Sequence, residues 1–324
     1  MAAVDLVLIG RNEGARLVAG LASAQGQARR IVYVDSGSTD ASVSEALRAG
    51  AEVVNLDMSV PFTAARARNA GFAALEANGP APEFVQFVDG DCTIVPGYLD
   101  QARAHLETND ELGMVTGWRS EIHRDASVYN QLCDWEWRRP AGIIDACGGD
   151  MMVRAEAFRQ VGGFDPTVIA AEDDEFCTRL RKAGWQLERI PVEMTRHDAA
   201  MFGFGQWWQR AVRTGHGFAQ VGALHPDYFQ RERRRAWAWA AGLPALAMFL
   251  MFWLGPWAIL PFVAVYVFSW MRTARGLNRS GLPKSEARSH ALLLTLSKFP
   301  NLIGMLRFYW RRFRNAQMRI IEYK

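Results

Sequence analysis

The chain has 324 residues, half of them hydrophobic and 22% charged, and this length suffices for one large or two ordinary domains. The net charge of +3 is uneven, because residues 1–200 carry 19 Lys and Arg against 30 Asp and Glu, whereas residues 272–324 carry 12 against 2. The acidic first part argues against nucleic acid as a partner, since a phosphate backbone must be neutralised by Lys and Arg, and four cysteines without CxxC spacing argue against a zinc site.

Short apolar runs alternate with amphipathic segments over the first 200 residues. Strand, helix and strand at this spacing predict an α/β domain with a mainly parallel sheet, in which ligands bind at the carboxyl ends of the strands. The predicted strands are residues 6–9, 31–34, 52–56, 84–88, 113–118 and 185–190. The predicted helices include "EGARLVAGLASA", "DASVSEALRAG" and "AARARNAGFAAL".

Residues 236–271 contain no charged residue and no histidine. A spanning helix needs about 20 apolar residues, and "GP" at 255–256 divides this stretch into passes of 19 and 16 residues. We therefore expect a hydrophobic membrane hairpin, either spanning or re-entrant. Basic residues on both flanks place both of its ends in the cytoplasm. The alternative is a helical hairpin buried in a soluble core.

Four regions follow from this organisation: an α/β domain (1–200), an amphipathic and basic connector (201–235), the hydrophobic hairpin (236–271) and a basic tail (272–324). The tail interleaves apolar and basic residues, with Pro300 as a break. This pattern predicts an interfacial segment that buries one face and sets arginines against lipid phosphates. Nucleic-acid binding by the tail is the weaker alternative.

The second predicted strand ends at Asp35, before a Ser/Gly turn into a helix. A carboxylate there can accept a hydrogen bond from a nucleotide base, although Ser38 or Asp40 could equally explain the segment as helix capping. Arg66 and Arg68 lie two apart in a predicted helix, so only one of them should face a site at the strand ends. The sequence has no GxxxxGK[ST], and no GxGxxG follows the first strand, which excludes a P-loop and leaves a dinucleotide fold little support.

"FVQFVDGDCTIVP" places two carboxylates, Asp89 and Asp91, at the end of an apolar strand. In an extended segment such residues point to the same side and repel each other unless a cation lies beside them. Mg²⁺ is commonly held by one or two carboxylates together with substrate phosphates. The pattern predicts a metal–diphosphate site, although D-G-D is also ordinary turn chemistry.

A third acidic group, residues 172–175 ("EDDE"), opens a predicted helix. Acidic residues favour the first turn of a helix, but four in a row exceed what capping needs. Gly148–Gly149 and Gly162–Gly163 precede this group and offer flexible places where the chain can wrap a ligand.

The order of these motifs is more specific than any one of them. "VLIGRNEGARL", "VDSGSTD", "ARNAGF", "FVDGDC", "GGDMMVRAEAFRQVGGFD" and "EDDEFCTRLRKAGW" follow one another. Together they resemble family 2 glycosyltransferases of the GT-A fold over about residues 4–200. The hairpin and the ending "IIEYK" also resemble membrane-attached members that build exopolysaccharide or other surface glycans. "IGRNE" lacks the proline of many members, and "GQWWQRAVRTGHG" lacks the QxxRW motif of processive synthases.

The resemblance implies roles for individual residues. Asp173 would be the general base, and Glu172 would orient the acceptor. Asp91 would be the metal ligand, for Mg²⁺ or Mn²⁺. The residues implied at the nucleotide and its sugar are Ile9, Arg11, Asn12, Glu13, Asp35, Arg68 and Asp89.

Four further candidates come from the residues alone. His197 could approach the metal or diphosphate, although a lone histidine after a strand is more often structural. Trp137 could stack on a sugar, although core packing is an equal explanation. Gly148 and Gly149 are candidates for the acceptor or sugar side.

The expected function is that of an inverting, metal-dependent glycosyltransferase. A carboxylate would remove the proton of an acceptor hydroxyl as it attacks the anomeric carbon, and a divalent metal would neutralise the departing nucleoside diphosphate. The expected partners are a nucleotide-sugar donor (a UDP-sugar), a lipid-linked or membrane-proximal glycan acceptor and the membrane, but no nucleic acid. The expected location is the inner (plasma) membrane, with the catalytic domain in the cytoplasm.

Two other functions stay open from the sequence. A sugar-nucleotide-forming nucleotidyltransferase would share the α/β domain, but "GRNEGARL" does not supply the Gly-rich loop with Arg and Lys that such enzymes show. A non-catalytic, membrane-tethered sugar-binding module would not need the acidic motifs.

Overall fold

The computed structural model of the chain describes residues 4–322. These residues form two compact units: the first runs up to Arg124 and continues over Cys133–Ala200, and the second comprises Asp125–Leu132 and the residues from Met201 onward. The first three residues of the predicted α/β domain, and the last two of the predicted tail and its "IIEYK" ending, lie outside the described residues.

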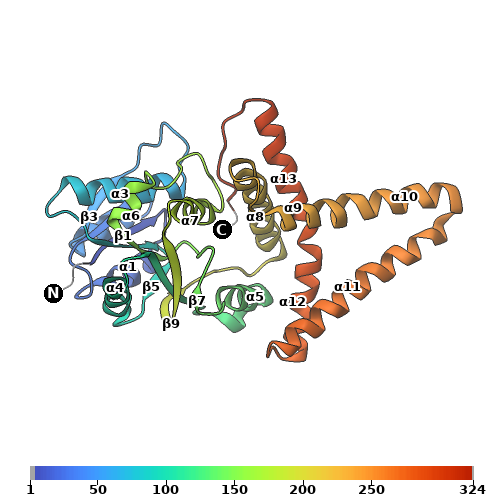
Figure 1. Cartoon of the computed structure of the whole chain (residues 1–324), viewed down its shortest axis with the longest axis horizontal. Coiled ribbons are helices and arrows are strands. Elements are labelled where there is room, and N and C mark those ends of the chain that lie inside the picture. The colour runs from blue at the N-terminus through green and yellow to red at the C-terminus, as the bar shows by residue number, and fades with distance from the viewer. Residues whose placement is uncertain (1–3, 323–324) are drawn as a thin grey trace. The chain divides into compact units, whose positions relative to one another are not determined.

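The first unit is built on one nine-stranded sheet with the order β3-β2-β1-β4-β8-β6-β9-β5, and β7 pairs with β9. Figure 1 shows this unit, with β1, β3, β5, β7 and β9 labelled. The α/β prediction is confirmed, and the structure adds that the sheet is mixed. Strands β3, β2, β1 and β4 are parallel, β6 is parallel to β9, and β5, β7 and β8 pair antiparallel to their neighbours. The strands are β1 (Val4–Gly10), β2 (Ile31–Asp35), β3 (Glu52–Asn55), β4 (Phe84–Asp89), β5 (Cys92–Ile94), β6 (Leu112–Glu121), β7 (Gly142–Ile143), β8 (Met151–Arg154) and β9 (Gln186–His197).

Helices cover both faces of this sheet, which explains the continuous apolar runs of its central strands. On β1, Leu6 and Leu8 join the core beneath one set of helices, and Val7 and Ile9 join the core beneath the other. The first set is α1 (Ala15–Ala24), α2 (Ser42–Arg48) and α4 (Tyr98–Thr108). The second set is α3 (Ala64–Ala77), α6 (Ala155–Gln160) and α7 (Glu172–Lys182).

The register of the parallel strands brings three loops to one edge of the sheet. Gly10 pairs with Asp35, and Ile9 pairs with Asp89. The loops that follow β1, β2 and β4 therefore leave the sheet side by side. Gly90 donates its N–H to the Ile9 carbonyl at 2.8 Å, and a Cβ on Gly90 would lie 3.0 Å from that oxygen. The glycine is needed here because the β4 loop passes against the end of β1.

The second unit is helical over most of its described part, and residues 316–322 at its end form neither helix nor strand. Its helices are α8 (Phe204–Leu224), α9 (Gln230–Trp237), α10 (Leu243–Leu254), α11 (Leu260–Arg279), α12 (Lys284–Leu296) and α13 (Lys298–Phe313). Helices α8 and α13 approach closely through glycines: a Cβ on Gly215 would lie 2.0 Å from the Asn301 carbonyl oxygen, and one on Gly304 would lie 2.0 Å from that of Val212. Helix α5 (Val128–Trp137) begins in the second unit and ends in the first.

The predicted hairpin is present as two long apolar helical segments, Gln230–Leu254 and Pro256–Arg279, with mean hydropathies of 1.6 and 1.3 in their most apolar windows. They meet where expected, at Gly255, whose φ of +85° and following proline end the first helix. Only 6% and 0% of those windows are buried. The alternative of a core hairpin is therefore wrong. Length and composition allow each segment to cross a membrane.

Candidate active site

Arg68 lies at the centre of a polar network in the first unit. It projects from α3, whose first turn is capped by the Thr63 hydroxyl accepting the Arg66 N–H at 3.1 Å. The Arg68 side chain is buried and donates to Asp89 Oδ1 and to Glu172 Oε1, each at 2.8 Å. Arg66 instead donates to carbonyls of the preceding loop. Of the two arginines, Arg68 alone joins the acidic motifs.

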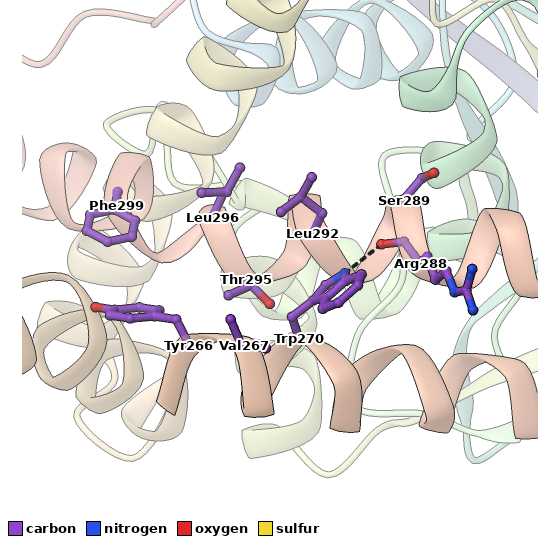
Figure 2. Close-up of a pocket in the computed structure, with 9 residues that line it drawn as sticks. All are labelled: Tyr266, Val267, Trp270, Arg288, Ser289, Leu292, Thr295, Leu296 and Phe299. Carbon is purple, nitrogen blue, oxygen red and sulfur yellow. Dashed lines mark hydrogen bonds between the residues drawn. The ribbon is translucent and has the colours of Figure 1, made fainter. Parts of the chain in front are cut away.

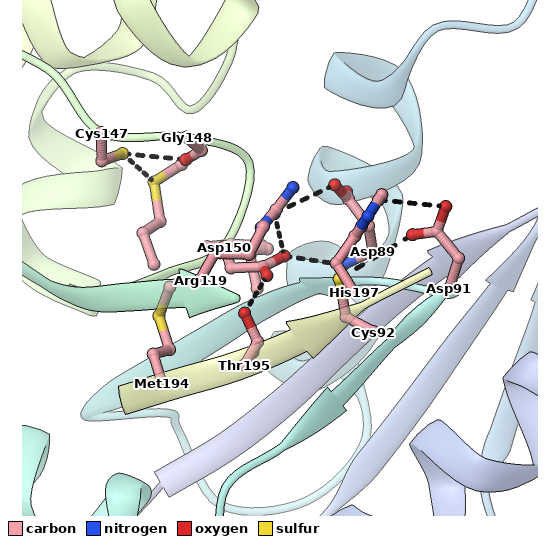
Figure 3. Close-up of polar contacts among 12 residues, drawn as sticks. Asp89, Asp91, Cys92, Arg119, Cys147, Gly148, Asp150, Met194, Thr195 and His197 are labelled. Atoms are coloured by element: carbon pink, nitrogen blue, oxygen red, sulfur yellow. Dashed lines mark hydrogen bonds and ion pairs between the residues drawn. The ribbon is translucent and has the colours of Figure 1, made fainter. Parts of the chain in front are cut away.

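Asp89 is held between two arginines. Besides Arg68, Arg119 from β6 lies 3.3 Å from Asp89 Oδ2 and 2.7 Å from Asp150 Oδ1 (Figure 3). Burial opposes the charged form, but Arg68 and Arg119 hold the pKa of Asp89 below its usual value. The carboxylate is therefore ionised and fixed. Its negative charge is balanced by guanidinium groups rather than left for a metal.

Asp150 fixes the backbone at the end of β4. It is fully buried, accepts the Asp89 N–H at 3.0 Å and accepts the Thr195 hydroxyl at 2.6 Å. A buried carboxylate that joins two strands and an arginine in this way sets the position of Asp89. No local pattern in the sequence marks Asp150, Arg119 or Thr195 as site residues, although Asp150 directly follows the glycine pair in "GGDMMV".

Asp91 lies beside His197, and both are nearly buried. Asp91 Oδ2 is 3.3 Å from His197 Nε2, and Glu121 Oε2 is 3.6 Å from Nδ1. Antiparallel pairing of β5 with β9 sets Cys92 opposite His197. Burial alone would lower the pKa of His197, but the neighbouring Asp91 and Glu121 carboxylates raise it. The two carboxylates thus favour the protonated form of the imidazole.

This pair fits a divalent cation. The donor atoms of Asp91, Cys92 and His197 all lie within 4.8 Å of one another. Carboxylate and imidazole are suitable ligands for Mn²⁺, and a carboxylate with phosphate oxygens suits Mg²⁺. Burial raises the pKa of the Cys92 thiol well above its ordinary value, so it stays a neutral thiol that a hard cation does not favour. Asp91 and His197 are thus the candidate ligands.

The four acids of α7 have different surroundings. Glu172 is buried against Arg68, and Glu175 pairs with Arg179 at 2.7 Å. Asp173 is only half-buried in the structure. Desolvation, followed by the charges of Asp174 and Glu172, raises the pKa of Asp173 well above its ordinary value. A carboxylate with a raised pKa at the start of a helix is a candidate general base.

The loops after β1 and β2 are interlocked. The Asn12 N–H donates to Ser38 Oγ at 2.9 Å, and Asn12 Oδ1 accepts the Thr39 N–H at 2.7 Å. Asp35 is buried and accepts from the Tyr33 hydroxyl and from the N–H groups of Gly37 and Ser38. The carboxylate thus shapes its own turn here, and recognition of a base by Asp35 stays a prediction.

The other residues predicted for the nucleotide lie in or next to the β1 loop. The Arg11 guanidinium lies over the Phe62 ring at 5.0 Å, Glu13 pairs with Arg16 at 2.8 Å, and Ile9 is buried at the end of β1. The structure brings this loop next to the β2 turn, as the register of the two strands requires. The role of these residues in nucleotide binding stays a prediction.

The glycine pair and Trp137 differ in what they contact. A Cβ on Gly149 would lie 2.6 Å from Arg68 Nη2 and 2.8 Å from Asp89 Oδ2, whereas one on Gly148 would meet no atom within 4 Å. Gly149 therefore leaves room for the Arg68–Asp89 ion pair. The Trp137 ring lies edge-on to His197, with 4.7 Å between the ring centroids, and 5.4 Å from the Arg119 guanidinium. Trp137 thus borders the Asp91–His197 pair; a sugar contact stays a prediction.

Comparison with known proteins identifies relatives of the chain. Residues 20–238 match the family described as "Glycosyltransferase like family 2". A pre-mycofactocin glycosyltransferase of Mycobacterium tuberculosis is 27% identical over 210 residues, which cover 61% of this chain. A TPR repeat-containing protein of Synechococcus elongatus is 26% identical over 206 residues, or 64% of this chain. The match spans only 43% of the length of each of these curated relatives.

The fold is also found among solved structures. A mannosyltransferase from Pyrobaculum calidifontis, solved in complex with GDP-Man and Mn²⁺, superimposes with a TM-score of 0.58 at 20% sequence identity, over 96% of this chain and 88% of that one. At this identity the likeness concerns the fold. It agrees with the mixed sheet flanked by helices on both faces. The chain has the GT-A fold and belongs to glycosyltransferase family 2.

Proposed function

We propose that this chain is an inverting, metal-dependent glycosyltransferase that uses a nucleotide-sugar donor. The observation that carries the proposal is the grouping at one sheet edge: the Asp91–His197 pair, with Asp89 fixed by Arg68 and Arg119. A cation-binding pair next to a fixed carboxylate suits a diphosphate and the sugar attached to it. Family membership supports the reaction class.

A divalent metal fits the Asp91–His197 pair. When bound, Mg²⁺ or Mn²⁺ would neutralise the negative charge on the departing nucleoside diphosphate. The mannosyltransferase of similar fold contains Mn²⁺, which supports this choice. Asp89, whose charge the arginines already balance, is left to accept hydrogen bonds from ribose or sugar hydroxyls.

Asp173 is the proposed general base. It would accept the proton of the acceptor hydroxyl as the oxygen attacks the anomeric carbon, and its raised pKa makes it a stronger base than an ordinary aspartate. Glu172 cannot take this role easily, because it is bonded to Arg68. Its bond to Arg68 links α7 to Asp89 and so positions Asp173. Direct displacement inverts the anomeric configuration.

The donor is proposed to be a UDP-sugar and the acceptor a lipid-linked or membrane-proximal glycan. The exposed apolar hairpin supports an acceptor at a membrane. Basic residues on both flanks of the hairpin support a location at the inner membrane with the catalytic domain in the cytoplasm. Exopolysaccharide or another surface glycan is the proposed product class.

A donor screen tests the proposed function. Membranes containing the chain are incubated with UDP-sugars and with GDP-mannose, with and without Mn²⁺, and nucleoside diphosphate release is measured. We expect Mn²⁺-dependent release from one donor class when endogenous acceptor is present, and opposite anomeric configurations in donor and product. Release of pyrophosphate from a nucleoside triphosphate and a sugar phosphate would favour a nucleotidyltransferase instead. Donor binding without transfer to any acceptor would favour a sugar-binding module.

A further inference from the structure

A groove lies between α11 and α12 in the second unit, at the base of the apolar hairpin, and has a volume of about 620 Å³. Figure 2 shows its lining, in which α11 provides Tyr266 and Trp270, α12 provides Leu292 and Leu296, and the first turn of α13 provides Phe299. Most of the lining is apolar. A volume in this range suits a small ligand or part of a lipid, because ligand sites typically measure about 300–1,000 Å³.

The two ends of the groove differ in polarity. At one end the rings of Tyr266 and Phe299 stack with their centroids 6.1 Å apart. At the other end lie Arg288 and Ser289, and the Arg288 guanidinium points outward (Figure 2). The Trp270 indole N–H donates to the Arg288 carbonyl at 3.0 Å, which fixes the ring between the two ends. The groove therefore has an apolar interior and a cationic mouth.

The groove also lies where the apolar segment of the chain becomes basic. The uncharged stretch ends at Met271, and Arg272, Arg275 and Arg279 follow on the same helix. Tryptophan favours the interface between hydrocarbon and headgroups, so Trp270 marks this boundary on α11. Arginines beside such a boundary attract anionic headgroups, each by about 1 kcal/mol near the surface.

We infer that this groove holds one acyl chain of an anionic bilayer phospholipid, with the lipid phosphate at Arg288. The inference rests on the membrane attachment proposed above and adds a specific lipid site to it. The apolar interior matches a hydrocarbon chain, and the cationic mouth matches a phosphate. The lipid would fill a groove that would otherwise leave Leu292 half exposed.

Native mass spectrometry of the full chain, extracted in detergent from vesicles of phosphatidylglycerol and phosphatidylcholine, tests the inference. We expect one retained phosphatidylglycerol per chain. Leu292→Asp should retain at least about tenfold less lipid, because a charge facing hydrocarbon is costly. Leu306→Asp is the matched control: Leu306 is 46% exposed against 51% for Leu292, but it lies on α13 outside the groove. It should retain lipid as the unmodified chain does.

A second variant tests the proposed contact between Arg288 and the lipid phosphate. Arg288→Gln should reduce the preference for phosphatidylglycerol over phosphatidylcholine by about fivefold, which is the effect of one cation near the surface. The control Arg307→Gln, on α13 outside the groove, should leave that preference unchanged.

Vesicle flotation of the same proteins separates this inference from membrane attachment. If the chain floats with vesicles but Leu292→Asp retains as much lipid as the control, the groove site is wrong and the attachment stands. If the unmodified chain does not float, both are wrong. If the unmodified chain forms a dimer without bound lipid, and Leu292→Asp loses this dimer, then a second copy of the chain occupies the groove. That result would overturn the lipid site.

Discussion

Arg68 joins two segments of the candidate active site that are far apart in the sequence. One guanidinium nitrogen bonds Asp89 at the end of β4, and the other bonds Glu172 at the start of α7. The planar fork of arginine suits two carboxylates at once, which a lysine ammonium cannot reproduce with the same geometry. Asp173, next to Glu172, thereby takes its position from an arginine on a third element.

Replacement of Arg68 should be costly to the fold. We expect Arg68→Met to lower the free energy of unfolding by about 3–5 kcal/mol, because Glu172 would lose its buried partner and Asp89 would lose one of its two arginines. Arg66→Met, on the same helix, removes bonds to loop carbonyls only and should cost less than about 1.5 kcal/mol. Denaturant unfolding of the two variants measures the difference, and equal losses would contradict the structural role of Arg68.

The raised pKa of Asp173 predicts a pH dependence. The base acts when it is deprotonated, so the rate should fall as the pH drops below the raised pKa of Asp173. This acid limb should lie above the usual aspartate pKa of about 3.9. Asp174→Asn removes a neighbouring negative charge, which lowers the pKa of Asp173 and should move this limb to lower pH. Asp110→Asn, at a side chain that is 99% exposed, should leave it in place. A profile unchanged in Asp174→Asn would count against Asp173 as the base.

Among the elements, the contact of α3 with β1 brings Arg68 to the carboxyl ends of the parallel strands. A Cβ on Gly71 of α3 would lie only 2.3 Å from Val7 Cγ1. Gly71→Ala should therefore destabilise the protein by about 1–3 kcal/mol through overpacking. Gly205→Ala, at a helical glycine with no atom within 4 Å of its added Cβ, should cause no loss. Thermal unfolding compares them, and an unaffected Gly71→Ala would show that the helix can move away from the strand.

The parallel half of the sheet can be predicted from the sequence because both faces of its central strands are buried. Such strands need nearly continuous apolar runs; "LVLI" is one, and "FVQFV" is interrupted only by the buried Gln86. Strands β5 and β7 are not predicted, because two or three residues are too few for a recognisable period, and the four-residue β8 is not predicted either. The strand predicted at residues 185–190 stops just before Pro191. In the structure, β9 continues to His197 beyond an irregular stretch of its pairing with β6.

The presence or absence of a local sequence signal also explains which site residues can be predicted from the sequence. Asp89 and Asp91 follow a predicted strand, and Glu172 and Asp173 belong to an acidic group, so each has a local signal. Arg119, Asp150 and Glu121 have none, because long-range strand pairings bring them to the site: β8, which follows Asp150, lies antiparallel to β4 and β6, and β6 lies parallel to β9. For His197 the sequence offers only a lone histidine; the pairing of β5 with β9 brings it to Asp91.

For the whole molecule, the charge distribution and the apolar hairpin predict different responses of membrane binding to salt. Attraction between a basic tail and anionic lipid weakens as the screening length falls from about 10 Å at 0.1 M to about 3 Å at 1 M. Insertion of two apolar helices does not depend on this screening. We expect the chain to float with vesicles at both salt concentrations. Release at 1 M would mean that the basic tail alone holds the chain to lipid.

We propose that nucleotide-sugar transfer takes place between the sheet edge at Asp91 and the start of α7. The most direct measurement is Mn²⁺-dependent release of nucleoside diphosphate by the unmodified chain, Asp91→Ala and Asp173→Asn, with donor and membrane acceptor supplied. We expect release by the unmodified chain and its loss in both variants. Asp173→Asn, which keeps the Asp91–His197 pair, should still bind the donor with Mn²⁺. Normal turnover by both variants would show that neither carboxylate takes part in the transfer.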